Sequence, residues 1–248
     1  MNELIQIESA IKRLYGSFFE ELNIDPNSGI ISGKPLRFSG MPYLGFLYPY
    51  AKERILFIGM DIGQDELFHS FESRRINISH TACGLTEIPR NKPFNPHIAG
   101  TYAMAFALLH SINNWNNSWQ SFSSIKDKTA YRAIQDNHTI LPVNLLDFVA
   151  LTNVHKFVTI DRVNRSGGQD RKWNQYEKEI QLLRDEISLL SPDIIVIQGI
   201  SLAYLKTDLN IPSSTRVIIS AHPAARSRYY RSIGYIESLL SANEIISQ

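Results

Sequence analysis

The sequence predicts an α/β fold, a three-layer α/β/α sandwich with a central, mostly parallel four-stranded sheet. Two observations support this prediction. Continuous apolar runs of strand length occur at 54–59, 192–199 and 216–223, and such runs are typical of strands buried on both faces. Segments with helical spacing separate them, at 99–112 and 173–190, as expected where helices connect parallel strands.

The first part of the chain combines one helix, one loop and one strand. Residues 3–22 carry apolar side chains at helical spacing, so we expect an amphipathic helix there. Residues 24–50 alternate glycine with proline and are rich in aromatic residues. This composition predicts a loop, whose rings either wall a pocket or seal an edge of the core. RILFIG at 54–59 predicts a buried strand, and an irregular stretch follows to about residue 97.

The rest of the chain alternates between helical and extended patterns. AGTYAMAFALLHSI at 99–112 predicts a helix, and residues 138–154 contain two extended segments. WNQYEKEIQLLRDEISLL at 173–190 predicts a long helix. PDIIVIQG at 192–199 predicts a buried strand with a short helix after it, and RVIISAHP at 216–223 predicts the last strand before a terminal helix.

Length and composition indicate a single globular domain. The chain has 248 residues without repeats or a low-complexity linker, so we predict one domain over 1–248, with residues 1–50 packed on it. The net charge of +1 gives no general attraction to nucleic acid, so a polyanionic partner requires a local basic patch.

The single cysteine and the lack of long apolar runs predict the cellular location of the protein. Cys83 is the one cysteine in the sequence, which excludes an internal disulfide framework and an all-cysteine iron–sulfur site. No apolar run has membrane-spanning length, and the N-terminal residues do not form a signal peptide. We therefore predict a cytoplasmic protein that makes no contact with a membrane, and we expect a monomer because nothing in the sequence demands a dimer.

Polar residues of different chemistry follow the predicted strands. Asp61 comes after the first strand, Asn153 ends the extended segment before residue 154, and His222 ends the last strand. Gln198 adds a second amide. Open parallel sheets bind ligands outside the carboxyl ends of their strands, so we expect an acid, an amide and an imidazole to line one crevice.

Each of these residues also has a structural explanation. Asp61 could cap a helix or a turn, Asn153 could be a turn amide, and His222 could be hydrogen-bonded at a strand end. Gly59 and Gly63 could simply permit a tight turn. The placement of all three polar side chains at strand ends is what favours a functional site.

Five segments of the chain resemble the uracil-DNA glycosylase superfamily. GMDIG at 59–63 resembles its first motif, and FVALTNVHKFV at 148–158 resembles the strand that ends in the base-reading asparagine. HPAARS at 222–227 resembles the second motif. KPFNPHIAGTYAMAFALL at 92–109 resembles the stretch whose phenylalanine stacks on the base, and SPDIIVIQG at 191–199 resembles the penultimate strand.

Three departures from the superfamily pattern concern substrate and cofactor. The branch with the most similar asparagine segment holds an iron–sulfur cluster with four cysteines, whereas this chain has one. Ala224 and Ala225 follow the His-Pro pair where serine and proline are common, and Ile62 replaces the usual proline of the first motif. These departures do not change the chemistry that the resemblance implies, whereas they leave open which base is excised.

The resemblance implies a role for each residue around a flipped base. Asp61 would stabilise positive charge on the sugar and orient a water, and His222, as a neutral imidazole, would donate an N–H to the base oxygen. Asn153 would read a pyrimidine edge and Phe94 would stack on the ring, although Phe94 could equally be a core residue. The predicted base-binding residues are Asn153, Phe94, Met60, Ile62 and Gly63.

Two basic segments are candidate DNA contacts. The resemblance also implies that Arg226, four residues after His222, is the side chain that enters the duplex when a base flips out. The other predicted DNA-binding residues are Arg228, Arg231, Arg165 and Arg171. The segment around 226–231 could instead be a solvated helical turn, and the segment around 162–172 an exposed loop.

The sequence therefore leaves three functions open. The first is a monofunctional DNA glycosylase, since no lysine stands at a motif position to cleave the strand. It would act on a pyrimidine-type base in single- or double-stranded DNA. The second is a glycosylase that excises a bulky modified base from foreign DNA, such as phage DNA. The third is a non-catalytic nucleotide-binding protein of the same fold. We expect no cofactor and no metal.

Overall fold

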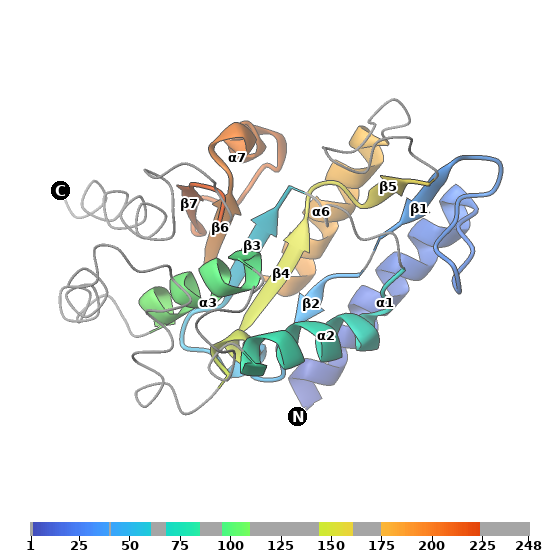
Figure 1. The fold of residues 1–248 in the computed structure, drawn as a ribbon. Coiled ribbons are helices and arrows are strands. Elements are labelled where there is room, and N and C mark those ends of the chain that lie inside the picture. Colours follow the sequence, from blue (N-terminus) through green and yellow to red (C-terminus); the bar gives the residue numbers. More distant parts are fainter. Residues whose placement is uncertain are drawn as a thin grey trace.

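The computed structural model describes residues 2–39, 41–60, 68–84, 96–109, 144–160 and 175–223. Within these residues, the chain contains both helices and strands, and short runs of one kind follow short runs of the other (Figure 1). The helices are α1 (Asn2–Leu22), α2 (Phe71–Gly84), α3 (Pro96–Leu109), α6 (Tyr176–Leu190) and α7 (Leu205–Asp208). The strands are β1 (Leu36–Phe38), β2 (Tyr43–Leu44), β3 (Ile55–Gly59), β4 (Val149–Asn153), β5 (Phe157–Thr159), β6 (Ile194–Gln198) and β7 (Arg216–Ser220).

The main sheet is mixed and mostly parallel, as an α/β fold requires. Its strand order is β2-β4-β3-β6-β7, and β3 pairs in parallel with both β4 and β6. β7 adds a further parallel strand at one edge, and β2 pairs antiparallel with β4 at the other. β1 and β5 form a separate antiparallel pair.

The prediction of a four-stranded sheet is wrong, because this sheet has five strands. The additional strand is β2, which has only two residues, Tyr43–Leu44. It lies in the segment rich in glycine and proline that the sequence predicts to be a loop. Two residues are too few to show the alternation of a strand, so pairing with β4 decides this conformation.

The three central strands of this sheet, β4, β3 and β6, are buried on both faces. Along β3, Ile55, Leu56, Phe57 and Ile58 are all fully buried, as the continuous apolar run predicts. Leu56 and Ile58 belong to a hydrophobic cluster that also contains residues of α1 and α6. Figure 1 shows α6 behind the sheet and α3 in front of it.

Helix α1 joins the core through one of its sides. Its buried residues are Ile7, Ile11, Tyr15, Phe18 and Phe19. Their spacing of three and four residues is the helical period that the sequence shows. They pack in the same cluster as the buried residues of α6.

Within the described residues, no helix has both the length and the apolar character needed to cross a membrane.

Tyr48 gives the core a measurable dependence on pH. The ring is fully buried, and its hydroxyl donates to the backbone carbonyl of Leu190 at 3.1 Å. Burial raises the pKa of Tyr48, because a phenolate would lose its hydration. In the unfolded chain a tyrosine titrates near pH ~10. The stabilisation by Tyr48 is therefore complete below that pH and is lost as the pH rises above it.

Replacing Tyr48 by phenylalanine should remove one proton from this alkaline transition. Above pH ~10 the wild-type free energy of unfolding should fall by roughly 1.4 kcal/mol per pH unit more steeply than that of Tyr48→Phe. Urea unfolding at a series of alkaline pH values measures both slopes. Burial also raises the pKa of Tyr15. The free energy of unfolding of Tyr48→Phe should therefore still fall with pH, with a smaller slope. Identical slopes in the two proteins would contradict this prediction.

Candidate active site

The carboxyl ends of the parallel strands bring three predicted site residues to one edge of the sheet. Gly59 at the end of β3 is in register with Asn153 at the end of β4. Gln198 at the end of β6 is in register with Ser220, two residues before His222. Asn153, Met60 and His222 are all partly buried. The edge predicted from the sequence therefore carries the amide and the imidazole.

Gly59 lets the amide oxygen of Asn153 approach the end of β3 closely. A Cβ atom at this position would lie 2.8 Å from Oδ1 of Asn153 and 3.8 Å from Oε1 of Gln198. The first distance is shorter than a van der Waals contact, so any side chain at residue 59 would displace the Asn153 amide. The absence of a side chain at residue 59 thus permits the observed placement of Asn153.

Gln198 lies at the same edge of the sheet and is a further candidate site residue, although it is not among the base contacts predicted from the sequence. Its Nε2 donates to Oγ1 of Thr101 in α3 at 2.8 Å, and both side chains are buried. This bond turns the Gln198 carbonyl oxygen toward Gly59. A glutamine at the last position of an otherwise apolar strand was the signal available in the sequence.

Helix α3 lies against the ends of β6 and β7 through its first turns. A Cβ atom at Gly100 would lie 2.7 Å from Cβ of Pro223, so the helix approaches the chain after β7 very closely. The rings of His97 and His222 meet edge to face, with centroids 4.6 Å apart and planes at 88°. This contact fixes the ring of His222 from one side. His97, which is exposed, therefore belongs to the candidate site.

Met60 follows β3 at this edge of the sheet, and both its side chain and its backbone carbonyl have partners within the protein. Its side chain packs against the hydrophobic cluster of α1 and α6. Its carbonyl oxygen accepts a hydrogen bond from the backbone N–H of His155 at 2.9 Å. The prediction that Met60 contacts a base stays a prediction.

The other predicted site residues lie outside the described residues. These are Asp61, Ile62, Gly63, Phe94, Arg165, Arg171, Arg226, Arg228 and Arg231. Among the residues that are described, no group of three or more histidine, cysteine, aspartate or glutamate side chains could hold a metal ion. The predictions for these nine residues, and for the absence of a metal, stay predictions.

A hollow of about 340 Å³ lies elsewhere, between α1 and α6. It is lined by Leu14, Ser17, Phe18, Glu21, Glu177, Lys178, Gln181, Leu182 and Asp185. None of these residues lies at the carboxyl edge of the sheet. Its acidic and amide side chains differ from the basic and aromatic lining that would suit a nucleic acid.

No protein-family model matches this chain, and no curated protein matches it.

Proposed function

We propose that this protein is a monofunctional DNA glycosylase of the uracil-DNA glycosylase superfamily, with a three-layer α/β/α fold. It flips a pyrimidine-type base out of DNA, hydrolyses the N-glycosidic bond and leaves an abasic site. The observation that supports this most strongly is the Asn153 amide packed beside Gly59 at the sheet edge that also carries His222. An amide offers both a donor and an acceptor, as a pyrimidine edge requires.

In this proposal two charges develop as the bond between the base and deoxyribose C1′ breaks. The sugar becomes positive, and the carboxylate of Asp61 stabilises it and orients the attacking water. The departing base becomes negative, and an N–H of the neutral His222 imidazole donates to its oxygen. The edge-to-face contact with His97 holds the His222 ring in place.

The DNA would be held by the two basic segments. A base in a duplex reaches the pocket only after leaving the stack, which costs roughly a few kcal/mol. Arg226 would fill the space that the base vacates. Arg228, Arg231, Arg165 and Arg171 would contact phosphates. The protein would act as a cytoplasmic monomer, without a cofactor, in DNA repair.

A second candidate function is excision of a bulky modified base from foreign DNA, as a defence against phage. Its support is the small pair Ala224 and Ala225 after His222. Two small side chains at this position leave more room near the base than the serine and proline of the superfamily pattern. A non-catalytic nucleotide-binding role is the third candidate.

Oligonucleotides that carry different bases distinguish these functions. Each oligonucleotide holds uracil, hydroxymethyluracil or a hypermodified cytosine, and alkali then cleaves any abasic site. We expect alkali-dependent cleavage at uracil or hydroxymethyluracil, and no cleavage without alkali. Cleavage only at the hypermodified cytosine would establish the second function. No cleavage of any oligonucleotide, together with a Tm raised by nucleotides, would overturn both glycosylase functions and support the third.

A further inference from the structure

A short buried linker follows the strand that carries Asn153. It consists of Val154, His155 and Lys156 and connects β4 to β5. Their exposed fractions are 0 %, 4 % and 2 %. A histidine and a lysine are rarely buried to this degree unless their polar atoms are paired. The contacts of this linker therefore indicate what keeps it in place.

The linker is bonded to the end of β3 as well as to β4. The N–H of Val154 donates to the carbonyl of Gly59 at 2.9 Å, and the N–H of His155 donates to the carbonyl of Met60 at 2.9 Å. Gly59 is the residue beside the Asn153 amide, and Met60 directly precedes Asp61. The linker thus joins the carboxyl ends of β3 and β4 at the edge that carries Asn153.

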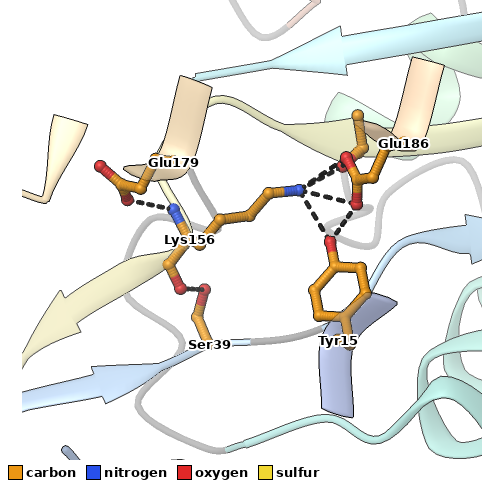
Figure 2. Close-up of polar contacts among 6 residues, drawn as sticks. Tyr15, Ser39, Lys156, Glu179 and Glu186 are labelled. Atoms are coloured by element: carbon orange, nitrogen blue, oxygen red, sulfur yellow. Dashed lines mark hydrogen bonds and ion pairs between the residues drawn. The ribbon is translucent and has the colours of Figure 1, made fainter. Parts of the chain in front are cut away.

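Helix α6 holds the linker through a buried carboxylate. Oε1 of Glu179 accepts the backbone N–H of Lys156 at 2.6 Å, and Oε2 lies 3.5 Å from Nδ1 of His155. On the other side, the N–H and the hydroxyl of Ser39 donate to the carbonyl of Lys156 at 2.8 and 3.0 Å. Figure 2 shows Glu179 and Ser39 on opposite sides of the Lys156 backbone.

The side chain of Lys156 ends in a second buried group of contacts. Its Nζ lies 2.9 and 3.0 Å from the two oxygens of Glu186, 2.6 Å from Oγ1 of Thr152 and 3.0 Å from the hydroxyl of Tyr15. The same hydroxyl donates to Glu186 (Figure 2). Burial lowers the pKa of Lys156, and the charge of Glu186 opposes this effect.

We propose that Glu179, Lys156 and Glu186 are positioning residues that clamp the linker and thereby fix Asn153 and Met60 for recognition of the base. This inference rests on the proposed function, because it assigns recognition to Asn153. Displacing the linker would leave buried charges and N–H groups without partners, which is strongly unfavourable. The linker therefore has one preferred arrangement, set from the side of the sheet that faces α1 and α6.

Glu179→Ala tests the clamp without removing a residue that contacts the base. The first readout is the ratio of excision rates for the best base and the next-best base, which does not depend on the fraction of folded protein. We expect this ratio to fall roughly tenfold, because a displaced amide discriminates poorly. Glu179→Gln, which keeps an acceptor for the Lys156 N–H, should restore most of the ratio. Ser39→Ala removes a single bond and should lower the ratio less.

A second readout requires no DNA. The amides of Val154, His155 and Lys156 should exchange hydrogen roughly ten times faster in Glu179→Ala than in the wild type. Tyr48→Phe is the matched control, because it removes a buried hydrogen bond to α6 that does not touch the linker. It should change neither readout.

The two readouts separate the clamp from the proposed function. A wild-type protein that acts on no base would overturn the function, and amide exchange would still decide whether the linker is clamped. An unchanged rate ratio together with unchanged exchange in Glu179→Ala and Ser39→Ala would overturn the clamp. Faster exchange with an unchanged ratio would overturn the role in positioning Asn153.

Discussion

Replacing His222 by alanine is expected to slow base excision by roughly 100- to 1,000-fold, as removal of one donor to a developing oxyanion does in other enzymes. The donor acts on charge that appears only as the glycosidic bond breaks. The variant should therefore bind substrate DNA about as well as the wild type. Asp61→Asn should slow the same step, because a neutral amide cannot stabilise positive charge on the sugar.

Single-turnover kinetics with excess protein measures this step directly, and a filter or gel assay measures DNA binding. Lys178→Ala is a suitable control, because Lys178 pairs with Glu21 on the surface between α1 and α6. Its rate should lie within about twofold of the wild type, since exposed ion pairs contribute little. If both His222→Ala and Asp61→Asn retained the full rate, the assigned roles would be wrong.

The sequence predicts those elements whose pattern is long enough to be decisive. The apolar runs of β3, β6 and β7 and the helical spacing of α1, α3 and α6 lie where the structure has these elements. Helix α2 lies within the stretch predicted to be irregular. Its sequence, FESRRINISHTACG, has no continuous apolar side. Contacts of single residues such as Phe71 and Arg75, both buried, hold it instead.

A general rule for parallel sheets predicts which edge of the sheet carries the candidate site. The contacts of the side chains at this edge could not be predicted in this way. Parallel strands place their carboxyl ends together, so Asn153 and His222 were expected at one edge. The bond from Gln198 to Thr101 depends on how α3 packs, which no local pattern records. No local sequence pattern distinguishes Lys156 from an exposed lysine. Only the tertiary structure shows that it is buried.

One signal for the buried charges was nevertheless present in the helix at 173–190. Glu179 and Glu186 are seven residues apart and align with Leu183 and Leu190 on the buried side of α6. On an amphipathic helix, acidic residues are expected on the solvent side. Two glutamates within the apolar stripe therefore indicate buried partners of opposite charge, even though the sequence does not identify Lys156 as that partner.

Lys156→Met should lower the free energy of unfolding by about 3–5 kcal/mol, the usual effect of removing one member of a buried ion pair. The methionine fills a similar volume, so the loss arises mainly because Glu186, which is fully buried, keeps a charge without its ammonium partner. Such a loss is a large part of the total stability of a typical domain, roughly 5–15 kcal/mol. Denaturant unfolding followed by circular dichroism measures it.

Removing the whole polar group separates the cost of an unpaired charge from the value of the pair. In the variant Tyr15→Phe/Thr152→Val/Lys156→Met/Glu186→Leu, no member of the group (Figure 2) remains without its partner. We expect this variant to regain most of the stability lost in Lys156→Met, because apolar replacements of similar volume are often neutral. A decrease in the free energy of unfolding below about 1 kcal/mol in Lys156→Met would contradict the argument. Removing the charged partner of a buried carboxylate is expected to destabilise the protein by more than this. If the fourfold variant were instead less stable than Lys156→Met, the polar group itself would be a net source of stability in this core.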